Sequence, residues 1–306
     1  MVLLEFLREE GIRPHLIQEL KLFRSEYPAG AEAQSRIRAP RYLYYGRKIW
    51  EEAIAALLCG ENLLLTGPKA TGKNVFAENL AAAFGRPSWN ISLSIHTDAA
   101  SLIGSDTFIN GEVLFREGPV SRSARLGGFG VLDEINMARN EALAVLHEAL
   151  DFRKSIDIPG YDRIPLHKAS RFIATMNYGY AGTRELNEAL ASRFVVIDMP
   201  AISSENLQRL MEREFPGISS KWSEQFCRLF LELQKKCASA EISAKALDLR
   251  GLIAAVRLIG KGLPAQDALA LGIINKVFDP YERKLIEDLI NARIPQSLGR
   301  ETLFQA

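Results

Sequence analysis

Two stretches of this sequence combine glycine, lysine and carboxylate residues in patterns that could do chemistry. The first is the loop Gly67-Pro68-Lys69-Ala70-Thr71-Gly72-Lys73-Asn74-Val75, which follows an apolar run and precedes a helical pattern. Its glycines would let backbone N–H groups converge on phosphate oxygens, the helix would add the positive end of its dipole, and Lys73 would add a point charge. We therefore predict that the loop binds the phosphates of a nucleoside triphosphate. The alternative is a glycine loop that only caps a helix.

The second stretch is the apolar run 128–134, which ends in Asp133 and Glu134. Ligands gather at the carboxyl ends of strands in open α/β sheets, so we expect both carboxylates at the same site as the loop. Asp133 would hold Mg²⁺, and Glu134 would polarise the water that attacks the γ-phosphate. The alternative is a solvated acidic pair that caps the next helix, a role that Asn136 could also fill.

One residue of the loop departs from the expected pattern. Such loops carry Ser or Thr after the lysine, and its hydroxyl holds Mg²⁺, whereas this chain has Asn74. An amide oxygen is a competent ligand for a hard cation, but the side chain is longer and its nitrogen cannot bind the metal. We therefore predict Asn74 and Asp133 as the metal ligands, and the sequence supports nucleotide binding more strongly than turnover.

Asn177 and Arg193 are candidates further along the chain. Asn177 follows an apolar run and could bind the attacking water or the γ-phosphate, although a turn residue before Gly179 would look the same. Arg193 precedes the last apolar run, from where a guanidinium can reach the nucleotide of a neighbouring subunit and accelerate hydrolysis. Arg184 is the second choice for that role. A surface salt bridge is the alternative for both arginines.

Arg250 is the last candidate, within an amphipathic helical pattern that covers 246–252. From a mobile helical domain it could reach over the nucleotide and couple lid closure to the γ-phosphate. Lys245 is a weaker candidate, because five residues place it on a different side of the helix. A solvated arginine would explain Arg250 equally simply.

The elements that must position these residues can be read from the apolar pattern. We expect strands at 62–66, 88–91, 129–132, 171–175 and 194–197, separated by helical stretches that include 74–84 and 138–150. Strands that alternate with helices form a parallel sheet covered on both faces. The predicted class is therefore α/β, with a five-stranded parallel sheet.

Two hairpins interrupt the alternation, and the strand signals end after Pro200. Asn110-Gly111 stands between apolar runs in 107–115, which is the strongest short-range signal for a tight turn, and 155–167 turns around Pro159-Gly160 in a looser way. Residues 201–295 read as four or five helices. We therefore expect three parts: a helical extension at 1–45, an α/β nucleotide-binding domain at 46–200 and an α-helical lid domain at 201–306.

Composition limits the classes of partner. The chain has 38 basic and 37 acidic residues, a net charge of +1, which argues against a surface built mainly to hold nucleic acid. Its three cysteines show neither a metal-binding spacing nor a disulfide framework, so we expect reduced thiols and a cytoplasmic protein. Charges interrupt the apolar residues at the start of the chain, so no signal peptide or membrane span is expected.

Several motifs together resemble a known family. Leu132-Asp133-Glu134-Ile135-Asn136-Met137-Ala138, Ala174-Thr175-Met176-Asn177 and the stretch from Gly182 to Phe194 resemble the MoxR branch of the AAA+ ATPases, over about residues 45–295. The spacing is most similar to the CbbQ, NirQ and NorQ type, which act as chaperones or activases. This resemblance implies a P-loop AAA+ fold and a hexameric ring that binds ATP and Mg²⁺ at subunit interfaces. It also implies protein remodelling, often with a partner that carries a von Willebrand factor A domain.

The resemblance also implies roles for single residues. It assigns Lys73 as the Walker A lysine and Asp133 and Glu134 as the two Walker B carboxylates. It assigns Asn177 as sensor one, Arg193 as the arginine finger and Arg250 as sensor two. The Asn110-Gly111 hairpin would face the pore or the target, and Asn90 would restrain Glu134 as a switch, although a buried amide at a strand end would look the same.

Two other functions remain open. A nucleotide-binding scaffold with little hydrolysis is suggested by Asn74. A ring that remodels nucleic acid is the third reading, and the hairpin at 107–115 weighs against it because it carries Glu112 and no basic residue.

Overall fold

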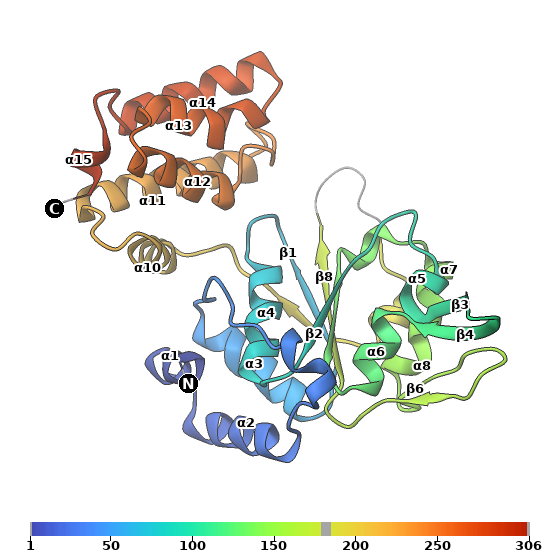
Figure 1. Cartoon of the computed structure of the whole chain (residues 1–306). Coiled ribbons are helices and arrows are strands. Elements are labelled where there is room, and N and C mark those ends of the chain that lie inside the picture. The colour runs from blue at the N-terminus through green and yellow to red at the C-terminus, as the bar shows by residue number, and fades with distance from the viewer. Residues whose placement is uncertain (1, 179–184, 305–306) are drawn as a thin grey trace. The chain divides into compact units, whose positions relative to one another are not determined.

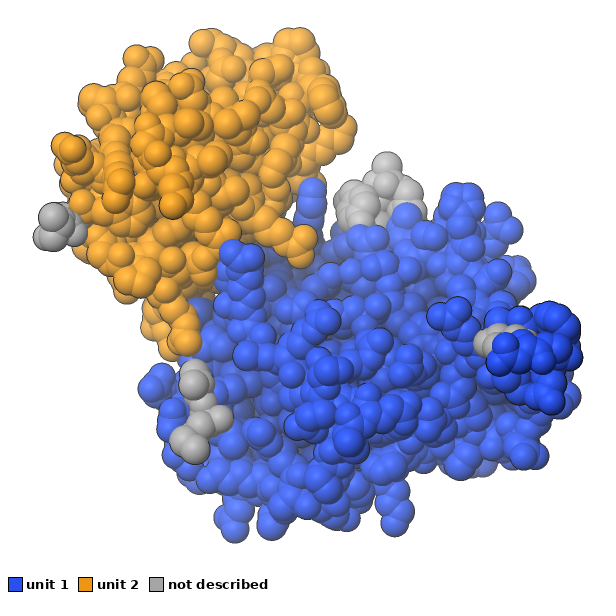
Figure 2. All heavy atoms as spheres, viewed as in Figure 1, with its two compact units in different colours: residues 1–200 blue, residues 201–306 orange. Residues whose placement is uncertain are grey.

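The computed structural model describes residues 2–178 and 185–304. The chain divides into two compact units, residues 1–200 and 201–306, which Figure 2 colours separately. The first unit contains a five-stranded sheet covered by helices, and the second is built from helices (Figure 1). The predicted fold class, α/β with a five-stranded parallel sheet followed by a helical region, is therefore confirmed.

The sheet of the first unit is parallel throughout, with the strand order β2-β5-β8-β1-β9. Its strands are β1 (Leu63–Gly67), β2 (Ser88–Ser92), β5 (Phe129–Asp133), β8 (Arg171–Asn177) and β9 (Val195–Asp198). All five lie within two residues of the ends expected from the sequence. This agreement arises because buried strands of a parallel sheet are short, continuous apolar runs, and β1 is buried along its whole length.

Helices cover both faces of this sheet. Those of the first unit are α1 (Val2–Glu9), α2 (Pro14–Glu26), α3 (Arg47–Leu58), α4 (Lys73–Ala83), α5 (Ala99–Ile103), α6 (Pro119–Arg125), α7 (Asn140–Leu143), α8 (His147–Leu150) and α9 (Glu188–Ala191). The long helix expected at 138–150 is instead divided, because a 3₁₀ turn at Ala144–Leu146 separates α7 from α8.

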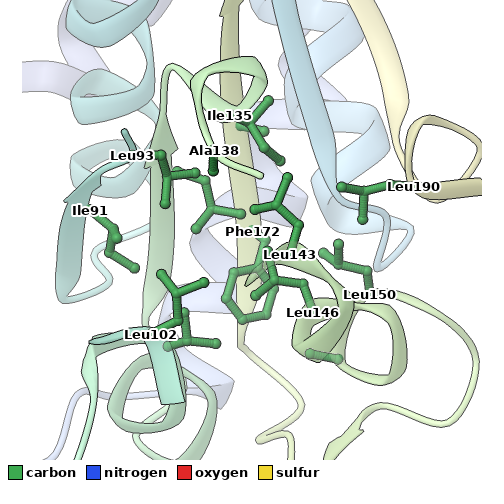
Figure 3. Packing of buried hydrophobic residues seen from close by; sticks show 14 of the residues in the cluster. Ile91, Leu93, Leu102, Ile135, Ala138, Leu143, Leu146, Leu150, Phe172 and Leu190 are labelled. Atoms are coloured by element: carbon green, nitrogen blue, oxygen red, sulfur yellow. The ribbon is translucent and has the colours of Figure 1, made fainter. Parts of the chain in front are cut away.

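The two faces of β8 serve different purposes. Phe172 and Ala174 belong to a buried apolar cluster formed with residues of α5 to α9, and Figure 3 shows Leu143 and Leu146 beside Phe172. Side chains alternate along a strand, so Ile173, Thr175 and Asn177 point to the opposite face. Helix α4 packs against β1, β5 and β8. Both faces of β8 are thus packed in the interior, and the α4 face also brings the polar end of β8 to the start of α4.

Both predicted hairpins are present. Strands β3 (Gly104–Ile109) and β4 (Glu112–Glu117) pair in antiparallel fashion around Asn110 and Gly111, whose φ values of 53° and 90° are those of a tight turn with positive φ. Strands β6 (Ser155–Ile156) and β7 (Ile164–Pro165) form the shorter hairpin. Between them, Tyr161 donates a hydrogen bond of 2.6 Å to Asp106, which joins the two hairpins.

The second unit consists of amphipathic helices around their own core. They are α10 (Ser204–Glu214), α11 (Ser220–Ala238), α12 (Leu249–Gly260), α13 (Ala265–Gly272), α14 (Pro280–Arg293) and the short α15 (Arg300–Leu303). Side chains cap two of them, since Ser203 accepts from the Asn206 N–H and Asp279 accepts from the Glu282 N–H. No helix in the described ranges is both long enough and apolar enough to cross a membrane.

Arg86 fastens the N-terminal segment to the sheet. The side chain is 2% exposed and donates hydrogen bonds to the backbone oxygens of Tyr27, Gly127 (2.6 Å) and Leu126 (3.2 Å). Burial lowers the pKa of its guanidinium. A single cation therefore satisfies three carbonyl groups from two segments that are distant in sequence.

We predict that Arg86→Ala destabilises the protein by about 3 kcal/mol, because one buried and two partly buried carbonyl groups lose their donor. Urea unfolding followed by circular dichroism measures this loss. Arg228→Ala is the matched control, since Arg228 forms an exposed pair with Glu224 one helical turn away, and such pairs contribute about 0.3–0.5 kcal/mol. Equal stability losses in the two variants would show that the contacts of Arg86 stabilise the protein no more than an exposed ion pair does.

Candidate nucleotide-binding site

The loop between β1 and α4 has a backbone that only a few residue types can adopt. Gly67 has a φ of 146°, and a Cβ atom there would lie 2.7 Å from the carbonyl oxygen of Met199. Ala70 and Gly72 also have positive φ, 65° and 84°. These turns bring the chain to Lys73, where α4 begins. The result is a compact turn followed by a helix N-terminus, the arrangement that favours phosphate binding.

Lys73 lies folded back over this loop. It is 6% exposed, and its ammonium group donates to the Gly67 oxygen (2.9 Å), the Pro68 oxygen (2.8 Å) and the Thr71 hydroxyl (3.2 Å). Burial lowers its pKa to about 8, against the opposing influence of Asp133, Asp198 and Glu134. The lysine therefore carries its charge at neutral pH, close to three carboxylates at the ends of neighbouring strands.

Asp133 joins the loop to the sheet. Its Oδ2 accepts a hydrogen bond of 2.7 Å from the Asn74 amide, and its Oδ1 accepts one of 2.6 Å from the Thr175 hydroxyl. The loop, the end of β5 and the end of β8 thus meet at one carboxylate. This is the convergence on which the two sequence motifs depend, and the structure brings them together.

Glu134 turns out of the strand that precedes it. Its φ and ψ of 56° and 50° are left-handed, which costs a non-glycine residue on the order of 1 kcal/mol and is found most often at functional sites. Its N–H donates to the Thr175 hydroxyl at 3.1 Å, and its Oε1 accepts from the Asn177 amide at 3.4 Å. The exposed carboxyl group of Glu134 and the amide of Asn177 therefore lie together at the carboxyl edge of the sheet.

Two residues at this edge have roles that the sequence did not predict. Asn136 is buried and donates to the backbone oxygen of Asn177 at 3.1 Å, so it fixes the end of β8. Thr175 contacts both residues of the carboxylate pair. The signal that could have found Thr175 is its position two residues before Asn177, which places both side chains on the same face of the strand.

Arg193 is bound within its own subunit. Its guanidinium donates to the Ala189 oxygen and lies 3.7 Å from Asp151, and the side chain is 24% exposed. A hydrogen bond from Arg153 is the main cause that lowers the pKa of Asp151, and the charge of Arg193 adds to it. The ion pair weighed as an alternative for Arg193 is therefore present. Arg184 lies outside the described residues, as does Gly179.

Arg250 belongs to the second unit. It is exposed in the first turn of α12, which begins at Leu249 rather than at Ala246 as the sequence pattern suggested. Lys245 precedes that helix, and its ammonium group lies 5.6 Å from the ring centre of Phe278. Asp248 precedes α12 in an extended conformation, and its side chain accepts a hydrogen bond from the Lys276 ammonium group. The helix therefore begins only after this residue.

Asn90 is not at the end of its strand. It is exposed in the middle of β2, level with Val131, whereas Ser92 is the residue of β2 that lies level with Asp133. The alternative of a buried amide at the end of the strand is therefore wrong, and the role of Asn90 as a switch for Glu134 stays a prediction. The reason is register, since β2 continues two residues beyond Asn90.

The donor atoms at the site suit a magnesium ion shared with phosphates. Asp133 offers carboxylate oxygens and Asn74 an amide oxygen, which are ligands that hard cations accept. In the described part of the chain, no three His, Cys, Asp or Glu side chains gather to hold a metal. Mg²⁺ is commonly held by one or two protein groups together with phosphates and water, and Asp133 and Asn74 are two such groups.

Comparisons with known proteins show the family of the chain. The family model of the AAA domain (dynein-related subfamily) matches residues 62–194, which contain the loop, both carboxylates and β8. The uncharacterized protein YojN of Bacillus subtilis (strain 168) is 34% identical over 297 residues, 95% of this chain and 94% of its own length. The chain belongs to the AAA family. AAA domains bind nucleotides, as a rule with Mg²⁺, and act as ATPases that are commonly oligomeric.

Further relatives extend over the same range. The uncharacterized protein SH1500 of Staphylococcus haemolyticus (strain JCSC1435) is 32% identical over 257 residues, 82% of this chain and 97% of its own length. A solved protein from Cytophaga hutchinsonii ATCC 33406 aligns over 92% of this chain and 98% of its own, with a TM-score of 0.46 and 16% identity. The matches to YojN and SH1500 therefore extend over both units of the chain.

The buried lysine of this AAA domain gives a prediction on pH. Its pKa of about 8 in the folded protein lies below the ordinary 10.5, so the unfolded chain binds more protons above pH 8 and stability must rise there. We expect the nucleotide-free protein to gain about 2 kcal/mol relative to Lys73→Met between pH 7.5 and 9.5. Urea unfolding of both proteins measures this. Parallel pH curves would contradict the burial of a charged Lys73.

Proposed function

We propose that this AAA protein is an ATP-hydrolysing remodelling machine of the MoxR type. Its subunits form a hexameric ring in the cytoplasm, with ATP between neighbours, and act on a protein target, with a partner that carries a von Willebrand factor A domain. The observation that supports hydrolysis best is the pair of hydrogen bonds that Asp133 accepts from Asn74 and Thr175. These contacts join the glycine-rich loop to the carboxylate pair, which supports a common site for both.

Each residue then has a defined task. The N–H groups of the loop and the charge of Lys73 bind the β- and γ-phosphates, while the Asn74 oxygen and Asp133 hold the metal. Bound Mg²⁺ would neutralise charge that develops on the phosphates. Glu134 accepts a proton from the attacking water, and Asn177, hydrogen-bonded to the same carboxylate, orients that water. Arg193 of the neighbouring subunit contacts the γ-phosphate, and Arg250 couples the helical unit to its presence.

A nucleotide-binding scaffold with little hydrolysis is the second candidate, and Asn74 favours it. The amide nitrogen of Asn74 is committed to Asp133, so only its oxygen is available to a metal. Both carboxylate oxygens of Asp133 already accept a hydrogen bond and must share their remaining lone pairs with the cation. These contacts would make a weaker metal site than a hydroxyl and a free carboxylate.

The β3–β4 hairpin supports a protein target over nucleic acid. Phe108 and Val113 face each other across the strands and are 72% and 60% exposed. Its strands carry three carboxylates and one arginine, Asp106, Glu112, Glu117 and Arg116. An acidic hairpin with exposed apolar residues is a poor match to a phosphate backbone.

Glu134→Gln decides between the ATPase and the scaffold. The amide keeps the shape of the side chain but cannot accept the proton, so ATP turnover should fall at least about a hundredfold while nucleotide affinity changes less than about twofold. Phosphate release and fluorescent-nucleotide titration measure the two quantities. If Glu134→Gln releases phosphate at the same rate as the unaltered protein, the turnover does not come from this site and the scaffold reading gains.

Arg193 is tested by mixing subunits. Arg193→Ala alone should bind ATP normally and lose most hydrolysis, by a factor of about 10³. A ring that mixes Arg193→Ala with Glu134→Gln contains interfaces where an intact Glu134 meets an intact Arg193, so part of the activity should return. Each variant mixed with itself is the control. Mixtures that stay inactive would show that Arg193, held by Asp151, supports only its own subunit.

A further inference from the structure

The hydrogen-bond ladder between β5 and β8 stops just before the site. Its last paired residues are Leu132 and Ala174, although β8 continues to Asn177. Beyond this point Glu134 takes a left-handed conformation, which lies outside the extended range of the sheet. The Thr175 hydroxyl receives the Glu134 N–H at 3.1 Å, and a side chain therefore replaces the backbone acceptor that the sheet no longer provides.

The same hydroxyl also uses its only hydrogen. It donates to Asp133 Oδ1 at 2.6 Å, a short contact to a charged acceptor. Thr175 is 1% exposed, so water has little access to substitute for it. The Thr175 hydroxyl oxygen thus holds both the side-chain carboxylate of Asp133, which faces the loop, and the backbone N–H of Glu134.

We infer that Thr175 is a positioning residue for hydrolysis, which holds Asp133 in its metal-binding orientation and Glu134 in its left-handed, outward conformation. This inference rests on the proposed function. Oδ1 of Asp133 is anchored by Thr175, and Oδ2 faces the Asn74 amide, so the carboxylate cannot rotate without breaking a hydrogen bond. In this conformation Oε1 of Glu134 accepts a hydrogen bond of 3.4 Å from the Asn177 amide.

Position in the strand gives the second reason for the assignment. Thr175 lies level with Leu65 of β1, and Asn177 lies level with Gly67, the first residue of the loop. Alternation puts Thr175 and Asn177 on the face of the sheet that carries α4. Thr175 therefore lies two residues before Asn177 on the same face of β8, beside Asp133 and Glu134. From there it can orient the two carboxylates without touching the nucleotide.

Valine and serine separate the hydroxyl from the shape of the side chain. Thr175→Val keeps the branched shape and loses both hydrogen bonds, whereas Thr175→Ser keeps the hydroxyl. Ser121→Ala is the matched control, because the Ser121 hydroxyl is fully buried and donates to the Ile103 oxygen at 2.7 Å, away from the site. The experiment uses the full chain and measures ATP turnover against Mg²⁺ concentration, ATP affinity, and hydrogen exchange at the Glu134 amide.

We expect Thr175→Val to lower the maximal turnover at least about tenfold and to raise the Mg²⁺ concentration for half-maximal turnover, with ATP affinity at saturating Mg²⁺ within about twofold. The Glu134 amide should exchange at least about tenfold faster. Thr175→Ser should restore turnover to within about threefold of the unaltered protein. Ser121→Ala should leave turnover and its Mg²⁺ dependence unchanged. Unaltered turnover and Mg²⁺ dependence in Thr175→Val would overturn the inference, as would a serine variant as impaired as the valine one.

Failure of the proposed function can be distinguished from failure of the inference about Thr175. If the unaltered protein binds ATP but releases no phosphate, the ATPase proposal is wrong, and the exchange of the Glu134 amide and the Mg²⁺ dependence of ATP binding still report on Thr175. Faster exchange and a greater Mg²⁺ requirement in Thr175→Val, both reversed in Thr175→Ser, would support the positioning role. Identical values in all variants would refute it.

Discussion

The hydrogen bonds accepted by Asp133 are the contacts on which the proposed site depends. They join Asn74 at the start of α4 and Thr175 near the end of β8 to the end of β5. A charged acceptor with donors on both sides is held more firmly than one in water, because its partial burial strengthens each hydrogen bond. If either donor moved, the phosphate loop and the carboxylate pair would lose their common reference point.

Charge balance at the strand ends explains why a lysine can be buried there. Lys73 is nearly inaccessible and its pKa is lowered by that burial, yet the nearby carboxylates offset part of the cost. Its three hydrogen bonds to the loop satisfy all the donors of the ammonium group. The positive charge of Lys73 thus lies beside the loop that would bind a triphosphate, in surroundings where electrostatic attraction is stronger than in water.

Asn74 distinguishes this chain from the usual pattern of such loops. A hydroxyl at this position can donate and accept through one atom, whereas the amide divides these functions between nitrogen and oxygen. The structure shows the nitrogen bound to Asp133, so the oxygen is the atom left for a metal. The substitution is therefore compatible with metal binding, and it makes the position of Asp133 more dependent on its two donors.

The sequence alone determined the strands, the hairpin turn at Asn110-Gly111 and the two motifs of the site, since each depends on residues close together in the chain. It did not determine the break between α7 and α8 or the start of α12. Nor did it determine the level of Asn90 in β2, because strand register is fixed by pairing between distant segments. Only the tertiary structure revealed Thr175 as a partner of both carboxylates and Asp151 as a partner of Arg193. Such contacts join residues about forty positions apart, and no local pattern records which donors a fold will bring to an acceptor.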